Sequence, residues 1–223
     1  DSVTSIGRMA FAYCWSLESV TLSENISSIE DHTFYDCESL TSITIPNNVT
    51  YVGNYAFNSC NNLSAVTFGN NVTTIGSSAF AYCSSLSSVT IPASVSYIGY
   101  SIFESCNSLN SMVVESGNTT YDSRNNCNAI IETASNTLIT GCQSTMIPET
   151  VTTIGEQAFY DCDGLTTIAI PNSVTSIGYY AFADCNNLSS VDLGNGVTTI
   201  GGSAFEYCYA MTSITIPASV TEI

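Results

Sequence analysis

Hydrophobic and polar residues follow a pattern along this chain that repeats every 23 residues. One unit, LTSITIPNNVTYVGNYAFNSCNN, covers residues 40–62, and similar units begin at residues 17, 63, 86, 165 and 188. A phenylalanine marks the repeat at Phe11, Phe34, Phe57, Phe80, Phe103, Phe159, Phe182 and Phe205. A fixed period of this length predicts a solenoid, in which each repeat buries its apolar face only against its neighbours.

The columns of one unit predict its local structure. Ile43 and Ile45 alternate with Thr44, as in a short strand with one buried face, and Pro46 closes that strand. The segment VTYVG predicts a second extended piece, and its glycine permits a turn that a side chain would obstruct. The spacing of three and four in AFNSC predicts a short helical turn. The L-x-x-I-x-I core of the unit is typical of leucine-rich repeats.

One stretch breaks the period. Phe103 and Phe159 are 56 residues apart, which is two periods plus ten. We therefore predict a single solenoid over 1–223, with regular repeats in 1–108 and 148–223 and an irregular repeat in 109–147. The apolar segments NAIIET and NTLIT within it predict a β-hairpin.

The register of this hairpin depends on its turn. A two-residue turn at residues 134 and 135 places Ile131 opposite Leu138 and Cys127 opposite Cys142, at a separation compatible with a disulfide. We predict that the two cysteines are adjacent, and bridged if the compartment is oxidising. The turn lacks the Asn-Gly pair that such hairpins prefer, and a longer loop with the same centre would keep the pairing.

The consensus IPxSVTxIGxxAFxxC resembles the BspA-like (Bacteroides surface protein A-like) leucine-rich repeats, and the resemblance covers essentially the whole chain. It implies a right-handed, β-rich solenoid of the α/β horseshoe class. It also implies a secreted or cell-surface location and adhesion to host matrix proteins such as fibronectin or fibrinogen. A fold alone does not fix a function, so these are expectations.

Eight of the ten cysteines follow a repeat phenylalanine by three positions: Cys14, Cys37, Cys60, Cys83, Cys106, Cys162, Cys185 and Cys208. A metal array would need Cys-x-x-Cys pairs or histidines, and the only histidine is His32. Disulfides between stacked repeats would need side chains that point toward each other rather than in parallel. We interpret these residues as small, reduced, buried hydrophobes.

Composition narrows the range of partners. Only 9% of residues are charged, there is no lysine, and two arginines against 19 acids give a net charge of −17. Such a surface repels nucleic acid and anionic lipid, and no apolar run is long enough to span a membrane. No nucleophile motif or phosphate loop is present, so we expect no enzymatic activity and no cofactor or metal.

The outward position of the first strand is the candidate binding surface. Its residues are Thr21, Thr44, Thr67, Thr90, Val113, Ala169, Asp192 and Thr215, and we add Arg124 beside the predicted hairpin. The alternative is that threonine is simply favoured on an exposed strand. Tyrosines, which are enriched at interfaces, gather around the second strand and the turn: Tyr55, Tyr82, Tyr97, Tyr100, Tyr160, Tyr179, Tyr180 and Tyr207.

The leading hypothesis is a non-enzymatic cell-surface or secreted module that binds a protein partner, such as a host extracellular matrix or surface protein. The alternative is a structural spacer or filament subunit that self-associates. The segments SVTSI (2–6) and SVTEI (219–223) lie in the same phase of the repeat, and neither looks like a polar cap. We therefore predict that the native chain continues beyond at least one end, or that copies stack end to end.

Overall fold

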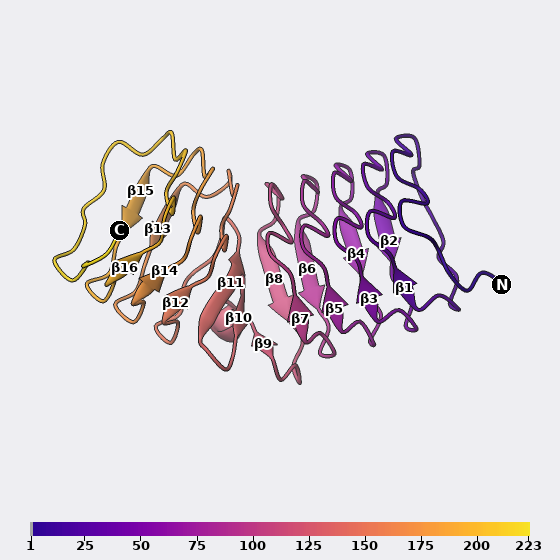
Figure 1. Cartoon of the computed structure of the whole chain (residues 1–223), viewed down its shortest axis with the longest axis horizontal. Helices are drawn as coiled ribbons and strands as arrows, with labels where there is room; N and C mark the ends of the chain where they lie inside the picture. The colour runs from indigo at the N-terminus through magenta and orange to yellow at the C-terminus, as the bar shows by residue number, and fades with distance from the viewer. Residues whose placement is uncertain (1) are drawn as a thin grey trace. The chain divides into compact units, whose positions relative to one another are not determined.

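The computed structural model describes residues 2–223, which form two compact units. Unit 1 consists of residues 2–109 together with Val114–Thr119, and unit 2 consists of Asn110–Val113 together with Thr120–Ile223. Within each unit the chain winds through successive coils, one coil for each repeat of the sequence (Figure 1). The leucine-rich-repeat solenoid predicted from the 23-residue period is confirmed.

In unit 1 the strands of successive coils fall into two sets. The first strands are β2 (Ser42–Thr44), β4 (Ala65–Thr67) and β6 (Ser88–Ile91), and β2 pairs in parallel with β4. The second strands are β1 (Ser28–Ile29), β3 (Tyr51–Val52), β5 (Thr74–Ile75) and β7 (Tyr97–Ile98), which form a parallel sheet in that order. Paired residues are 23 apart, as Tyr51 and Thr74 illustrate, so the sequence period sets the register.

Unit 2 has the same architecture and also contains the irregular repeat. Its first strands β13 (Thr167–Ala169) and β15 (Ser190–Asp192) pair in parallel, and β8 (Ser111–Val114) lies where the two units divide the chain. A six-stranded sheet runs in the order β16 (Thr199–Ile200), β14 (Ser176–Ile177), β12 (Thr153–Ile154), β11 (Thr137–Gly141), β10 (Ala129–Glu132) and β9 (Tyr121–Asp122). The predicted hairpin is therefore present as β10 and β11.

The hairpin is built into this sheet. β10 pairs antiparallel with both β11 and β9, and β11 pairs in parallel with β12. Because Leu138 is in register with Ile131 on one side and Ile154 on the other, the three buried side chains form one row. β11 thus takes the place of the second strand of a regular coil.

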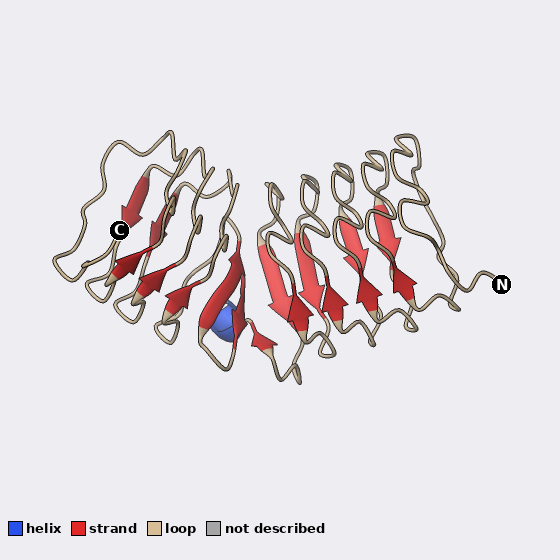
Figure 2. Ribbon diagram, in the orientation of Figure 1, coloured by secondary structure: helices blue, strands red, loops and turns tan. Residues whose placement is uncertain are grey.

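The predicted helical turn is wrong. In residues 2–223 the only helical segment is the short 3-10 helix η1 (Arg124–Asn126), and the segments around each phenylalanine are loops (Figure 2). In the coil of Phe57, N–H groups that donate to the next coil belong to Tyr55, Phe57 and Ser59, at 2.8–3.0 Å. The N–H groups that donate to a carbonyl three residues back belong to Ala56, Asn58 and Cys60. Successive N–H groups thus donate alternately to a carbonyl of the next coil and to a carbonyl of their own coil.

This alternation needs a special backbone conformation. The residue two before and the residue two after each repeat phenylalanine have positive φ, for example 56° at Tyr55 and 61° at Ser59. Successive β-turns with left-handed residues bury Ala, Phe and Cys at spacings that a helix would also give. The apolar spacing alone therefore could not distinguish the two structures.

Each core consists of stacked columns of the repeat residues. In unit 1 the rings of Phe11, Phe34, Phe57 and Phe80 stack with centroids 5.2–5.3 Å apart and planes within 7° of parallel. Phe159, Phe182 and Phe205 stack in the same way in unit 2. No single coil could bury its own apolar face, so each core depends on contact between neighbouring coils.

The glycine after the second strand lets the coils approach. A Cβ on Gly53 would lie 2.5 Å from the backbone nitrogen of Asp31, and one on Gly76 would lie 2.6 Å from that of Asn54. The prediction that a side chain would obstruct this position is confirmed, and the obstacle is the backbone of the preceding coil.

Candidate binding surface

The predicted surface column is exposed in both units. It comprises Thr21, Thr44, Thr67 and Thr90 in unit 1, and Val113, Ala169, Asp192 and Thr215 in unit 2. Ile43 and Ile45, which flank Thr44, are 2% and 1% exposed. The outward orientation follows from strand alternation, while the role of the column in binding stays a prediction.

Two open hollows in unit 2 meet at this column. One, of about 400 Å³, is lined by Ala169 and Asp192, and the other, of about 440 Å³, is lined by Asp192 and Thr215. Glu149 contributes a second carboxylate to the first hollow. Asp192, Leu193 and Asn195 line both hollows, so the column is recessed at Asp192 and negatively charged there.

Side-chain hydrogen bonds fix the rim of these hollows. The Asn195 N–H donates to Oδ1 of Asn172 in the preceding coil at 2.8 Å. In unit 1 the N–H of Asn70 donates to Oδ1 of Asn47 at 2.9 Å in the same way. Asparagine in the turn after the first strand therefore links one coil to the next, which holds the outward residues of that strand in place.

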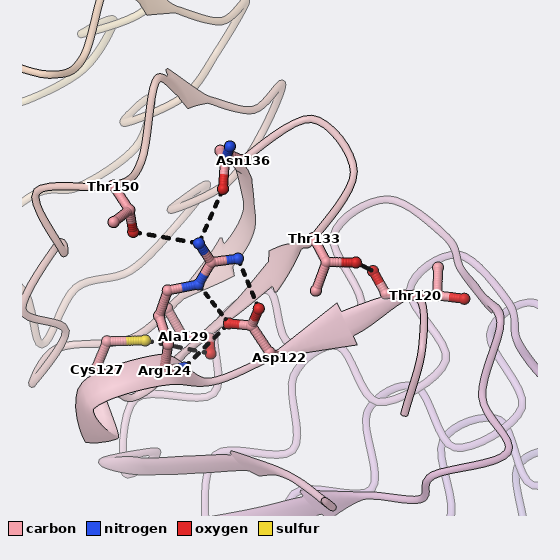
Figure 3. A network of polar contacts seen from close by, with 8 residues as sticks. All are labelled: Thr120, Asp122, Arg124, Cys127, Ala129, Thr133, Asn136 and Thr150. Carbon is pink, nitrogen blue, oxygen red and sulfur yellow. Dashed lines mark hydrogen bonds and ion pairs between the residues drawn. The ribbon is translucent and has the colours of Figure 1, made fainter. Parts of the chain in front are cut away.

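Arg124 lies at the centre of a network within unit 2 (Figure 3). Its Nε and Nη2 donate to the two carboxylate oxygens of Asp122 at 2.8 and 2.6 Å, and its Nη1 donates to Asn136 and Thr150 at 2.8 and 3.2 Å. The bond with Asp122 raises the pKa of Arg124 above its ordinary value. The side chain thereby joins β9, η1, the β10–β11 turn and the segment at residue 150.

This placement changes the interpretation of Arg124. A guanidinium has five N–H donors, and here four of its hydrogen bonds go to acceptors of its own chain. Its side chain is 25% exposed, and that of Asp122 is 31% exposed. Arg124 is therefore engaged in holding the irregular repeat together, and this geometry favours a structural role over a contact with a partner.

Cys127 and Cys142 are both free thiols in the structure. The predicted pairing of Ile131 with Leu138 is present, but the register shifts between Ile130 and Ile131, so that Ala129 pairs with Gly141. Beyond this irregularity the Cys142 thiol donates to the carbonyl of Asn128 at 3.3 Å, and the Cys127 thiol donates to that of Ala129 at 3.7 Å. One extra residue on β11 shifts the strand pairing by one position on this side of the hairpin, and the adjacency of the two cysteines and their bridging in an oxidising compartment stay a prediction.

The repeat cysteines form a ladder of S–H hydrogen bonds that the sequence did not suggest. The thiol of Cys60 donates to the carbonyl of Phe34 in the preceding coil at 3.2 Å, and that of Cys83 donates to Phe57 at 3.3 Å. The same bond, spanning 26 residues, is made by Cys37, Cys106, Cys185 and Cys208. Cysteine is thus a small core residue that also supplies a weak donor to the neighbouring coil.

Burial keeps these thiols protonated. It raises the pKa of Cys37 to about 11 and that of Cys162 to about 12, and it raises the pKa of Cys83 well above the ordinary thiol value. Thiolate is the form that binds metal and attacks disulfides. In residues 2–223 no group of three or more His, Cys, Asp or Glu side chains could hold a metal ion.

A third hollow, of about 490 Å³, lies on the turn segments of unit 1. Aromatic side chains from several coils line it, including Tyr13, His32, Tyr35, Tyr55 and Tyr82. His32 stacks on Tyr55 with centroids 4.9 Å apart, so it packs among tyrosines instead of standing alone. The abundance of tyrosine near the turns was visible in the sequence, but the hollow between them was not.

Comparison with known proteins identifies the family. The family model described as BspA type leucine rich repeat region (6 copies) matches residues 4–132 and 130–223. The chain belongs to this family. No helix in the part that the structure describes is long and apolar enough to cross a membrane.

Two solved structures of bacterial proteins resemble this member of the BspA-type family. A leucine rich cell surface protein from Faecalibacterium prausnitzii is 31% identical with a TM-score of 0.80, and the match covers 97% of this chain and 58% of that one. The pneumococcal vaccine antigen PcpA is 27% identical with a TM-score of 0.77, covering 89% of this chain and 50% of that one. This chain therefore spans only about half to three-fifths of these relatives. A search of the curated proteins finds no match.

Proposed function

We propose that this chain is a non-enzymatic binding module of a cell-surface or secreted protein, and that the outward positions of its first strands hold a protein partner. The observation that carries the proposal is the recess around Asp192, where two hollows coincide with the column of exposed first-strand residues. The family, and the surface protein and vaccine antigen that resemble the chain, support a location at the cell surface.

Charge indicates the kind of partner. The recess presents the carboxylates of Asp192 and Glu149, and the chain as a whole has a net charge of −17. Complementary charge accelerates encounter and suppresses wrong partners, so the partner should present a basic surface. A host extracellular matrix or surface protein with such a surface fits this description, whereas nucleic acid would be repelled.

Binding of the purified chain to immobilised fibronectin and fibrinogen tests the proposal. We expect Asp192→Asn to weaken binding by about twofold to tenfold, since an exposed charge contact contributes roughly 0.5–1.4 kcal/mol. Glu156→Gln is the matched control, because it removes the same charge from an exposed side chain of unit 2 outside the hollows. Ala169→Lys should weaken binding further, through both bulk and charge.

Two outcomes would count against this proposal. Equal loss in the Asp192 variant and the Glu156 control would mean that only the overall charge matters. The other outcome is that neither matrix protein binds while the apparent molecular mass, measured by light scattering, rises with the concentration of the chain. That result would replace the proposal with the structural role as a self-associating spacer.

A further inference from the structure

The hollow on the turn segments of unit 1 has the chemistry of a cation site. Its 490 Å³ are lined by the side chains of Tyr13, Tyr35, Tyr55 and Tyr82 together with His32 and Glu104. These residues lie from the first coil of the unit to the fifth, so the hollow follows the direction in which the coils stack. None of them belongs to the first-strand column.

The left-handed turns place these side chains. Tyr13, His32, Tyr55 and Tyr82 occupy the positive-φ positions that flank the repeat phenylalanines, with φ between 56° and 63°. Their backbone N–H groups donate to the next coil, as Tyr55 does to the carbonyl of Ser77 at 3.0 Å. The aromatic rings are thus attached to hydrogen-bonded backbone, which restricts their movement before any ligand arrives.

Tyr55 has one covered face and one open face. The residues at its repeat position in successive coils are Met9, His32, Tyr55 and Ser78. His32 stacks on Tyr55 from the preceding coil, with planes 25° apart. On the other side the column continues with Ser78, which has no ring, and the Tyr55 side chain is 39% exposed. The change from aromatic residues to serine therefore opens a ring face within the hollow.

Among the described residues that line the hollow, Glu104 is the only acidic side chain. The Tyr82 hydroxyl donates to Oε1 of Glu104 at 2.7 Å, which orients the carboxylate beside the aromatic wall. The two arginines of the chain, Arg8 and Arg124, are not among the lining residues. A cation that enters the hollow thus meets a carboxylate and aromatic faces, and neither arginine competes with it in the lining.

We propose that this hollow binds an arginine side chain from a basic segment of a protein partner. The planar guanidinium stacks on the open face of Tyr55 and takes Glu104 as its counter-charge, which combines cation–π and ionic attraction. Ammonium groups are compact and strongly hydrated, so lysine gains less from a flat ring. Neutral sugars also stack on tyrosine and can donate hydrogen bonds to a carboxylate, but they gain no ionic attraction from Glu104 or from the net charge of −17. The inference rests on the proposed function, because it supplies a second contact for the same basic partner.

Calorimetric titration with the peptide acetyl-Gly-Arg-Gly-Arg-Gly-amide tests the proposal. We expect Tyr55→Ala to weaken binding by about threefold to tenfold and Tyr55→Phe to retain it, because the ring and not the hydroxyl makes the contact. Tyr97→Ala is the matched control, since Tyr97 is an exposed tyrosine of unit 1 outside the hollow. Glu104→Gln should weaken binding, whereas Glu38→Gln, an exposed acid elsewhere in unit 1, should not.

The peptides themselves provide the second control. Replacement of each arginine by citrulline keeps the planar shape but removes the charge, and it should abolish measurable binding. Equal affinity for the citrulline peptide, or equal loss in the hollow variants and their controls, would overturn the proposal. Binding of a neutral oligosaccharide that is lost in Tyr55→Ala, with no response to the arginine peptide, would assign the hollow to glycans instead.

Binding to the immobilised matrix proteins separates this inference from the proposed function. If Tyr55→Ala and Glu104→Gln leave that binding intact while Asp192→Asn weakens it, the first-strand surface stands and the arginine site falls. The reverse result would retain the arginine site and reject the first-strand surface. Melting curves of every variant exclude loss of folding as the cause.

Discussion

Replacement of Gly76 by alanine should destabilise unit 1 by forcing two coils apart. The added Cβ would lie 2.6 Å from the backbone nitrogen of Asn54 and 2.7 Å from the carbonyl carbon of Gly53. Both atoms belong to the backbone of the preceding coil, so no flexible side chain can move aside. The Gly76 N–H also donates to the carbonyl of Val52 at 2.8 Å, and this bond must lengthen if the coils separate.

The magnitude follows from these contacts. Carbon atoms pack favourably at about 3.5–4.0 Å, so the coils must separate locally by roughly 1 Å. Overpacking of this kind costs about 1–3 kcal/mol, and a weakened hydrogen bond costs about 1 kcal/mol more. Alanine restricts the unfolded chain and so returns about 0.4–1 kcal/mol. We expect a net loss of about 1–3.6 kcal/mol in the free energy of unfolding.

Urea denaturation followed by circular dichroism measures this loss. Gly7→Ala is the matched control, because Gly7 occupies the same repeat position, and a Cβ built on it meets no heavy atom within 4 Å. We expect the Gly7 variant to change the free energy of unfolding by less than about 0.5 kcal/mol. If the two variants shift the denaturation midpoint equally, the close approach of the coils is not what selects glycine.

Four further predictions concern other features of the fold. Burial raises the pKa of the Cys83 thiol, so native protein should resist alkylation at mildly alkaline pH, and rapid labelling at Cys83 before unfolding would contradict this. Arg124→Lys should cost unit 2 about 1–2 kcal/mol in chemical denaturation, since lysine cannot reproduce the fork on Asp122, whereas Arg8→Lys should be neutral. Burial alone would raise the pKa of Asp31, but the hydrogen bonds from Asn54 and Tyr51 lower it below its ordinary value. The stability that this carboxylate contributes is therefore present above the ordinary pKa and is lost as the pH falls through the lowered pKa of the folded state. Asp31→Asn should accordingly reduce the fall in melting temperature that accompanies acidification. Replacement of residues 125–142 by a short turn should lower the melting temperature of unit 2, because it removes β10 and β11 from the sheet, and unchanged melting would show that the hairpin is dispensable.

The sequence predicted the repeating core well because each column has one dominant physical requirement. The positions of Phe57, Leu63 and Val52 must be apolar in every regular coil, and there the 23-residue period alone sets which residues stack. The existence of the hairpin and its pairing of Ile131 with Leu138 were also predictable, since two apolar strands flank one short turn.

Other features depend on information that the pattern does not contain. The apolar spacing around Phe57 fits both a helix and successive β-turns, and only the hydrogen bonds to the next coil distinguish them. The irregularity between Ile130 and Ile131 changes no residue type, yet it shifts the strand pairing by one residue on the side of the hairpin where Cys127 and Cys142 lie. The role of Arg124 depends on acceptors at Asn136 and Thr150, which are distant in sequence and meet only after folding.

The left-handed turn positions separate the variable part of the molecule from the part that folds. Within this one chain, the position two before each repeat phenylalanine carries methionine, histidine, tyrosine, serine or glutamine, while the phenylalanine itself does not change. The backbone at these positions is held by bonds from its own N–H group, which any side chain other than proline leaves in place. Each coil therefore offers one variable surface position, and these positions repeat at a spacing of about 5 Å along the stack. Substitution at one such position can change what the surface binds while the phenylalanine core stays in place. Randomising the residues two before each repeat phenylalanine would yield a library of binding surfaces on an unchanged backbone.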